Sequence, residues 1–375
     1  MTRKIYIRPI GLSQSPQSEE GEAIRLGGGM VYAHRFALIV REGSRIVSRR
    51  RVSAAQMTEA LAALPADLGS RAEAQWADLR IAHPPLTLAL RTGGERSIRL
   101  DQPQVMGILN VTPDSFSDGG KFLDDPVEAR DHSAAMLEAG AALIDVGGES
   151  TRPGAAAVWE GDELKRVIPA IEHLAAMGAA ISVDTRRVGV MEAALQAGAR
   201  IINDVSALRH DPRALEFAAG TGVPVVLMHA PGEGQDLHDC ADYEMPALDV
   251  FDWLEARRDA AVEAGIARAN IILDPGIGFG KSLAHNLAVL NALPLYHALG
   301  HPILLGASRK RFIGALSNEA PVHRRLGGSL AVAIAGMNAG VQLLRVHDVA
   351  ETVQARNVWR GMRDAALTDF SELPE

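Results

Sequence analysis

The sequence predicts an α/β protein in which a (β/α)8 TIM barrel follows a small α+β extension at the N-terminus. From residue 104 onward, eight short apolar runs alternate with Ala-, Leu- and Glu-rich stretches, as in a parallel barrel. A polar residue follows nearly every run. The charge also changes sign near residue 100, and 375 residues exceed the about 250 that a barrel alone requires. A barrel with one smaller unit fits these observations.

The first part of the chain is expected to form a unit of its own, residues 1–100, ahead of a catalytic barrel at 101–375. It carries 15 Lys and Arg against 9 Asp and Glu, a net +6, whereas the remainder carries 23 against 37, a net −14. Its patterning predicts two hairpins and a short helix, at 36–40 with 45–52, at 86–91 with 96–100, and at 56–64. The unit shows no catalytic spacing, which favours a structural or oligomer-contact role.

Composition argues against several classes of protein. The net charge of −8 argues against nucleic acid as the partner. Cys240 is the only cysteine, so no intrachain disulfide can form, which is typical of the reducing cytoplasm. The N-terminus lacks the apolar core of a signal peptide, and no stretch approaches the roughly 20 apolar residues of a membrane helix. We therefore expect a cytoplasmic protein without a membrane or nucleic-acid partner.

The predicted barrel strands all lie in the second part of the chain. Their ranges are 104–110, 142–147, 180–184, 200–204, 224–229, 271–275, 302–307 and 342–347. Helical stretches follow them, among them 126–139, 162–177, 187–197, 247–264 and 327–339. A doubly wound open sheet is the alternative fold, but no G-x-G-x-x-G fingerprint opens a first helix to support it.

Polar side chains gather at the predicted strand ends. They are Asn110, Glu149–Arg152, Asp184, Asn203–Asp204, His229, Asp274, Ser308–Lys310 and Arg345–His347. Turns favour polar residues, which would account for one or two of these. Eight apolar runs that all lead to charged or amide groups instead indicate one polar site, at the C-terminal ends of the strands where TIM barrels have their active sites.

The residue types at these ends suggest an anionic substrate. Four cations there can neutralise phosphate, namely Arg152, Arg309, Lys310 and Arg345. Asn110, with Thr112, offers oxygen ligands for a hard cation such as Mg²⁺. Three further residues have amide or carboxylate groups that can pair with a polar heterocycle: Asp184, Asn203 and Asp274.

Seven segments resemble the dihydropteroate synthase family, whose members are pterin-binding TIM barrels. They are 106–120 (MGILNVTPDSFSDGG), 144–154 (IDVGGESTRPG), 182–185 (SVDT), 202–205 (INDV), 274–281 (DPGIGFGK), 308–310 (SRK) and 345–348 (RVHD). The resemblance covers residues 104–356. Two features depart from it: His229-Ala-Pro-Gly232 stands where a Met-Gln-Gly-like stretch is more frequent, and residues 1–100 lie outside the common barrel.

The resemblance implies a transferase of folate biosynthesis. It would condense 6-hydroxymethyl-7,8-dihydropterin diphosphate with p-aminobenzoate, use Mg²⁺, form a homodimer and be a sulfonamide target. The substrate-binding residues it implies are Thr151, Arg152, Pro153, Asp184, Asn203, Met228, Asp274, Phe279, Ser308, Lys310, Arg345 and His347.

The resemblance also implies a role for many of these residues. Asp184, Asn203, Asp274 and Lys310 would hold the pterin ring; Asn110 would bind Mg²⁺; Thr151, Arg345 and His347 would bind diphosphate; Ser308, Phe279 and Pro153 would form the p-aminobenzoate pocket. The implied catalytic residues are Asp114, Lys310, Arg345 and His347, with Asp114 stabilising a cationic pterin methylene.

Two other functions share parts of this pattern. A pterin-binding methyltransferase would favour an adjacent corrinoid-binding module, and the sequence shows none. A non-catalytic pterin-binding paralogue would not need to keep every diphosphate, pterin and loop residue. The synthase reaction is therefore the favoured interpretation.

Overall fold

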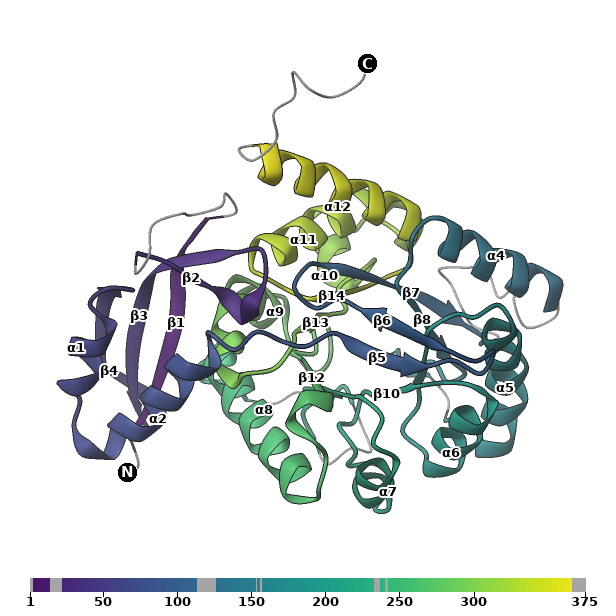
Figure 1. Ribbon diagram of the computed structural model, residues 1–375, viewed down its shortest axis with the longest axis horizontal. Helices are drawn as coiled ribbons and strands as arrows, with labels where there is room; N and C mark the ends of the chain where they lie inside the picture. Colours follow the sequence, from purple (N-terminus) through teal and green to yellow (C-terminus); the bar gives the residue numbers. More distant parts are fainter. Residues whose placement is uncertain are drawn as a thin grey trace.

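The computed structural model describes residues 3–13, 22–112, 126–152, 154–155, 157–232, 237–239 and 242–365. At its centre, eight parallel strands lie in the order β12-β11-β10-β9-β8-β7-β14-β13 (Figure 1). A parallel bridge between Leu273 of β12 and Ile303, which precedes β13, brings the two ends of this sheet together. The predicted TIM barrel is confirmed.

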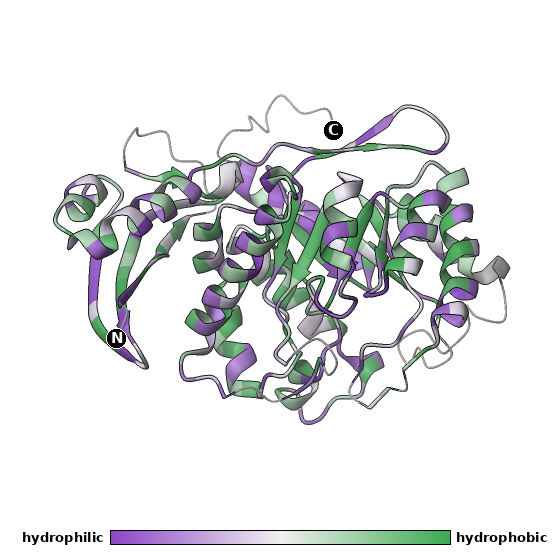
Figure 2. Cartoon of the chain, turned by 90° about the horizontal axis from the view of Figure 1, so that it is seen from below, coloured by the Kyte–Doolittle hydropathy of each residue, from purple (hydrophilic) through white to green (hydrophobic). Residues whose placement is uncertain are grey.

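All eight predicted barrel strands are present within their predicted ranges. They are β7 (Gln104–Asn110), β8 (Leu143–Gly147), β9 (Ile181–Asp184), β10 (Ile201–Asp204), β11 (Val225–Met228), β12 (Ile271–Asp274), β13 (Leu304–Leu305) and β14 (Leu343–Val346). Most of their residues are buried, because helices cover the outside of the barrel and side chains fill its inside. Figure 2 shows these apolar strands in the middle of the molecule.

Helices pack around the barrel. They are α4 (Pro126–Glu138), α5 (Glu160–Ala176), α6 (Val188–Ala197), α7 (Ala214–Thr221), α8 (Pro246–Glu263), α9 (Leu283–Asn291), α10 (Arg311–Ala315), α11 (Leu326–Asn338) and α12 (Val349–Asp364), with short 3-10 helices η2 (Arg268–Asn270), η3 (Leu293–Leu299) and η4 (Val322–Arg324). The five predicted helical stretches correspond to α4, α5, α6, α8 and α11. No helix among the described residues is long and apolar enough to cross a membrane.

A hairpin of β5 (Leu86–Ala89) and β6 (Glu95–Ile98) covers one end of the barrel. Its apolar residues Leu86, Leu88 and Ile98 form one cluster with barrel residues that include Met106 and Leu143, near the N-terminal ends of their strands. The hairpin was predicted to belong to the N-terminal unit at 1–100, but it packs against the N-terminal end of the barrel. The division into domains at residue 100 stays a prediction.

The rest of the extension is an antiparallel sheet with two helices. Its elements are β1 (Arg3–Ser13), β2 (Ile24–Arg25), η1 (Leu26–Gly28), β3 (Tyr32–Glu42), β4 (Arg45–Ser53), α1 (Met57–Ala62) and α2 (Ala66–Asp78). The predicted hairpin is β3 with β4, and the predicted helix at 56–64 is α1. The patterning did not predict β1, which pairs with β3 along most of its length.

The extension is attached to the barrel through α8 and η3. Tyr6 of β1 packs edge-on against Phe251 of α8 at 5.5 Å, and its hydroxyl donates to Asp252 at 2.9 Å. Arg41 of β3 pairs with Asp249 at 2.6 Å. Apolar contact and ion pairs therefore hold the basic extension against an acidic helix.

Candidate active site

The register of the barrel brings the predicted polar residues to one level. Asn110 is paired with Gly147, and Asp184 is paired with both Gly147 and Asn203. On the neighbouring strands, Asp274 is paired with Met228. Since all these residues end parallel strands, their side chains meet at the same mouth of the barrel.

Arg345 lies at the centre of this mouth. Its guanidinium donates from Nε to Asp145 at 2.6 Å and from Nη2 to Asp184 at 2.7 Å. Asn203 donates to the same oxygen of Asp145 at 3.0 Å. Residues of four strands, β8, β9, β10 and β14, thus share one hydrogen-bonded network.

Asp145 was missed from the sequence. It is fully buried in β8 and accepts from Arg345 and Asn203. A signal was available, because an acidic residue inside a buried apolar strand requires a partner for its charge. The identity of that partner depends on the closure of the barrel.

Burial changes the protonation behaviour of the paired groups. Burial raises the pKa of Asp184; the Arg345 guanidinium opposes this rise, and the Asp145 carboxylate adds to it. Burial lowers the pKa of Arg345, but the Asp145 and Asp184 carboxylates outweigh this effect and raise the pKa above its ordinary value. Arg345 is therefore charged throughout the physiological range, which favours ionised partners.

A second group of residues surrounds the turn after β12. The Asp274 carboxylate accepts from the backbone N–H of Gly276 at 2.7 Å. Lys310 donates to the Ile277 carbonyl, and its ammonium lies 4.3 Å from the centre of the Phe279 ring. Burial lowers the pKa of Lys310 to about 8, against the opposing effect of Asp274. A cation, a carboxylate and an aromatic ring are thus placed side by side.

Ser308 and His347 contact each other. The hydroxyl of Ser308 accepts from the backbone N–H of His347 at 3.2 Å and lies 3.1 Å from its Nδ1. Burial and the nearby Arg309 lower the pKa of His347 to about 3, so the ring is neutral at pH 7. Arg309, considered above as a phosphate cation, is paired with Asp348.

Ion pairs hold Glu149, near the start of the loop after β8. Glu149 pairs with Arg187 at 2.9 Å and with Arg186 at 3.0 Å. Although burial opposes it, hydrogen bonds from the two arginines lower the pKa of Glu149 to about 2. Further along, the Thr151 carbonyl lies 2.6 Å from Nε2 of His238.

Several predicted residues have a less central position or cannot be placed. The His238 ring stacks on Phe279 with 5.2 Å between the ring centres, so His238 contacts both Phe279 and the Thr151 carbonyl. Arg152 is exposed on this loop, and Met228 is buried at the end of β11. Asp114, Pro153 and Cys240 lie outside the described residues.

The predicted metal ligand faces the same space as the pterin residues. A Cβ atom at Gly147 would lie 3.7 Å from both Asn110 Oδ1 and Asp184 Oδ2, so the two oxygens border one space. The described residues contain no cluster of three or more His, Cys, Asp or Glu that could hold a metal. Mg²⁺ usually keeps several waters and is held by one or two carboxylates together with substrate phosphates. The Asn110 amide oxygen would therefore hold it only together with waters and substrate phosphates.

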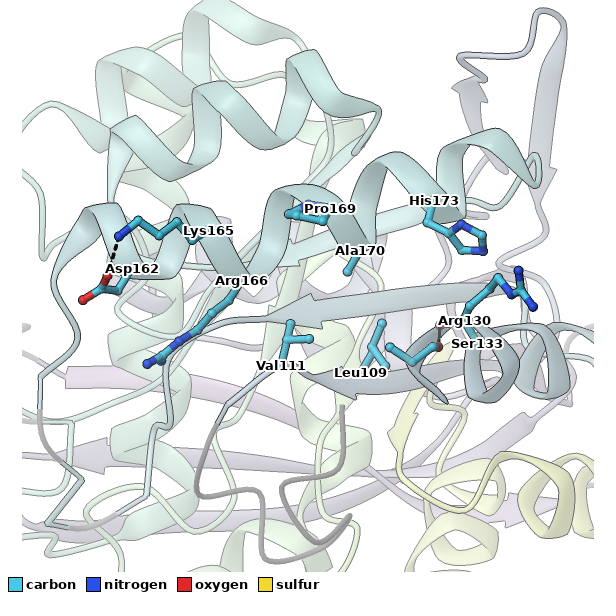
Figure 3. A pocket seen from close by; sticks show the side chains of 11 residues that line it. Leu109, Val111, Arg130, Ser133, Asp162, Lys165, Arg166, Pro169, Ala170 and His173 are labelled. Atoms are coloured by element: carbon cyan, nitrogen blue, oxygen red, sulfur yellow. Dashed lines mark hydrogen bonds and ion pairs between the residues drawn. The ribbon is translucent and has the colours of Figure 1, made fainter. Parts of the chain in front are cut away.

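A cavity of about 470 Å³ lies elsewhere, between α4 and α5 (Figure 3). Leu109 and Val111 form part of its wall, with Pro169 and Ala170 of α5. Side chains alternate along a strand, so these two residues lie on the opposite side of the chain from Asn110. The cavity is therefore separate from the polar site at the barrel mouth.

A TIM barrel with a buried carboxylate, guanidinium and amide network at its mouth defines an enzyme built to bind a polar, partly anionic substrate. The chain belongs to the family described as pterin binding enzyme, whose pattern matches residues 106–347. The extension lies outside this match.

Similar proteins agree with this assignment. Over 263 residues, the chain is 47% identical to a dihydropteroate synthase of Escherichia coli K12, covering 70% of this chain and 92% of that protein. A Xanthomonas albilineans dihydropteroate synthase with 4-aminobenzoic acid is 46% identical, with a TM-score of 0.68 and coverage of 78% and 100%. A Yersinia pestis dihydropteroate synthase in a sulfonamide drug complex is 45% identical, with a TM-score of 0.69 and coverage of 74% and 100%.

Proposed function

We propose that this chain catalyses the dihydropteroate synthase reaction of folate biosynthesis. It joins 6-hydroxymethyl-7,8-dihydropterin diphosphate to p-aminobenzoate and releases 7,8-dihydropteroate and diphosphate. The observation that carries the proposal is the network of Asp145, Asp184, Asn203 and Arg345 at the mouth of a barrel of this family. The identity of 47% to a dihydropteroate synthase supports it.

The pterin ring is bound at this network. Its polar edge carries ring nitrogens, an amino group and a carbonyl, which require both acceptors and donors. The carboxylates of Asp184 and Asp274 accept, the Asn203 amide does both, and Lys310 donates. Met228, buried at the end of β11, contributes an apolar contact.

The diphosphate leaves from the side formed by Ser308, Arg345 and His347. Arg345 uses Nε and Nη2 for the two carboxylates, which leaves Nη1 for a phosphate oxygen. In the tautomer that acts here, His347 accepts at Nδ1 from the Ser308 hydroxyl and carries its ring hydrogen on Nε2 as a neutral donor. Thr151 and Arg152 bind the diphosphate from the loop after β8. When bound beside Asn110, Mg²⁺ would neutralise the charge that develops on the diphosphate.

The bond change needs no nucleophile from the protein. The bond between the pterin methylene carbon and the diphosphate oxygen breaks, and the pair of electrons leaves with diphosphate. The aniline nitrogen of p-aminobenzoate forms the new bond to the methylene carbon and releases a proton. Ser308, Phe279 and Pro153 hold the aromatic acid, and Asp114 stabilises the cationic methylene.

We also propose a homodimer in the cytoplasm. Large apolar side chains stand exposed on the outer helices α11 and α12, among them Ile334, Val358 and Met362, the last 70% exposed. Such exposure favours contact with another copy. The single cysteine suits a reducing compartment. Light scattering of the wild type and of Val358→Glu tests the dimer, since the charge should shift the mass toward the monomer.

One assay tests the proposed function. The protein is incubated with pterin diphosphate, p-aminobenzoate and Mg²⁺, and both dihydropteroate and released diphosphate are measured. Equal amounts of the two products are expected. Binding of pterin without product would indicate a non-catalytic paralogue, and methyl transfer without diphosphate release would indicate a methyltransferase.

A further inference from the structure

Lys281 lies next to the pterin site and has no role in the reaction described above. It follows the turn between β12 and α9, and its ammonium group is surrounded by three acceptors. Nζ lies 2.8 Å from Nδ1 of His229, 2.8 Å from the Gly276 carbonyl and 3.2 Å from the Phe279 carbonyl. An ammonium group has three hydrogens to donate, so these three partners use all of them.

The three partners of Lys281 also contact Asp274 or Lys310, which are residues of the pterin site. Gly276 donates its backbone N–H to the Asp274 carboxylate at 2.7 Å. Phe279 has its ring 4.3 Å from the Lys310 ammonium. The backbone of His229 donates to the Asp274 carbonyl at 2.8 Å, which links the end of β11 to the same turn.

The turn that carries Asp274 and Phe279 approaches the end of β11 closely. Gly276 has a φ of +67°, and a Cβ atom there would lie 1.8 Å from the His229 carbonyl oxygen, so the two backbones are in close contact. The turn therefore packs tightly against β11. None of the three hydrogen-bond acceptors of Lys281 is a carboxylate, so its charge-assisted hydrogen bonds hold neutral groups in place. The positive charge of Lys281 also lowers the pKa of the nearby Asp274 carboxyl, against the effect of burial.

We propose that Lys281 is a positioning residue of the pterin site: its ammonium group, with His229 as a neutral acceptor, holds the turn from Pro275 to Gly280 in the shape that places the Asp274 carboxylate and the Phe279 ring. The inference rests on the proposed function, because it assigns these two groups to substrate binding. Burial and the positive charge of Lys281 lower the pKa of His229 well below its ordinary value, which keeps Nδ1 available as an acceptor.

The test compares Lys281→Met with Lys281→Arg. Burial lowers the pKa of Lys281 to about 7, so the measurements are made at pH 6, where the ammonium form predominates. Calorimetry gives the dissociation constant of an unphosphorylated pterin, and steady-state kinetics give KM and kcat. The Met variant should raise the dissociation constant and the KM for pterin diphosphate about tenfold, with a smaller change in kcat, and Arg should restore much of the affinity.

A second pair of variants guards against a simple loss of folding. His229→Asn keeps an acceptor near the Nδ1 position, whereas His229→Leu removes it. The Leu variant should resemble Lys281→Met, and the Asn variant should stay near the wild type. Gln75→Leu, in the extension, is the control for lost stability alone, and it should leave pterin affinity unchanged.

The outcomes distinguish a failure of the positioning role of Lys281 from a failure of the proposed function. The inference would be overturned if Lys281→Met bound pterin within twofold of the wild-type affinity. It would also be overturned if the Met and Arg variants lost pterin affinity equally and in proportion to the fall in their melting temperatures. Failure of the wild type to bind pterin would instead overturn the proposed function. The positioning role of Lys281 would then still be tested by hydrogen exchange. Lys281→Met should speed exchange of the Gly276 and Gly278 amides, which donate to Asp274 and Asn286.

Discussion

The guanidinium group of Arg345 joins Asp145 and Asp184, whose Oδ2 atoms lie 2.6 Å and 2.7 Å from its Nε and Nη2. The three residues come from β14, β8 and β9; β8 and β9 are adjacent strands, and β7 lies between β8 and β14. Arg345 was predicted to bind diphosphate, and its remaining donors leave that role open. Its two ion pairs add a second role, which is to hold the carboxylates of the pterin site.

Replacing Asp145 should therefore damage the site although Asp145 need not contact the leaving group. Asp145→Ala leaves Arg345 with one of its two carboxylates, and breaking a buried ion pair costs about 3–5 kcal/mol. Urea denaturation should show this loss, and calorimetry should show pterin affinity reduced at least about tenfold, the equivalent of about 1.4 kcal/mol. Asp131→Ala, at an exposed ion pair, is the control. Unchanged stability of Asp145→Ala would contradict the network.

Pterin affinity should depend on pH through Lys310. Burial lowers the pKa of Lys310 to about 8, so its ammonium form predominates below that pH and is lost above it. Affinity should therefore fall as the pH rises through about 8. In Lys310→Arg the side chain stays charged, so the fall near pH 8 should disappear, and only the part that comes from Lys281, whose pKa is about 7, should remain. An alkaline fall of the same size in both proteins would show that another group titrates.

The acid side of the same profile should report Asp274. Burial raises its pKa, against the opposing effect of Lys310, so the carboxylate takes up its proton at a higher pH than an exposed aspartate does. Affinity should thus decline from the acid side earlier than an ordinary aspartate would allow. Asp274→Asn should bind pterin weakly at all pH values and lose this acid limb. A limb that persists in the Asn variant would point to Asp184.

Asn110 should matter only when phosphate is present. Asn110→Ala removes the amide oxygen proposed to bind Mg²⁺, so turnover should require about tenfold more Mg²⁺, whereas affinity for unphosphorylated pterin should stay within about twofold. Turnover is titrated with Mg²⁺ after treatment with a chelator. Equal loss of affinity for the unphosphorylated pterin would mean that Asn110 belongs to the pterin site instead.

The extension should be separable from catalysis through Gln75. Its side-chain amide bonds to the edge of β1 that does not pair with β3, accepting from the Ile7 N–H and donating to the Ile5 carbonyl, both at 2.8 Å. Gln75→Leu leaves two buried backbone groups without partners, at a cost of about 1–3 kcal/mol for each unsatisfied group. Hydrogen exchange in β1 should accelerate while turnover is unchanged. A matching fall in turnover would show that the extension supports the active site.

The order of elements and the chemistry of the strand ends were available from the sequence. Apolar runs of strand length alternate with helical stretches because each strand of a parallel barrel is buried on both sides, and this pattern is local. Asn110, Asp184, Asn203 and Asp274 were placed correctly at one mouth, since every parallel strand points the same way. The first strand, β1, was missed because it is buried against α2, α8 and η3. These elements are distant from β1 in the sequence, so no local pattern indicates the contact.

The partners of these residues were decided only by the tertiary structure. Asp145 and Arg345 are 200 positions apart, and Lys281 and His229 are 52 apart, so no local pattern relates them. Arg309 was counted with the phosphate cations, but the fold pairs it with Asp348. The sequence by itself determined which charges stand at the strand ends. Closure of the barrel decided which of them neutralise each other and which remain for a substrate, because charge pairing acts over a few ångströms of space and not along the chain.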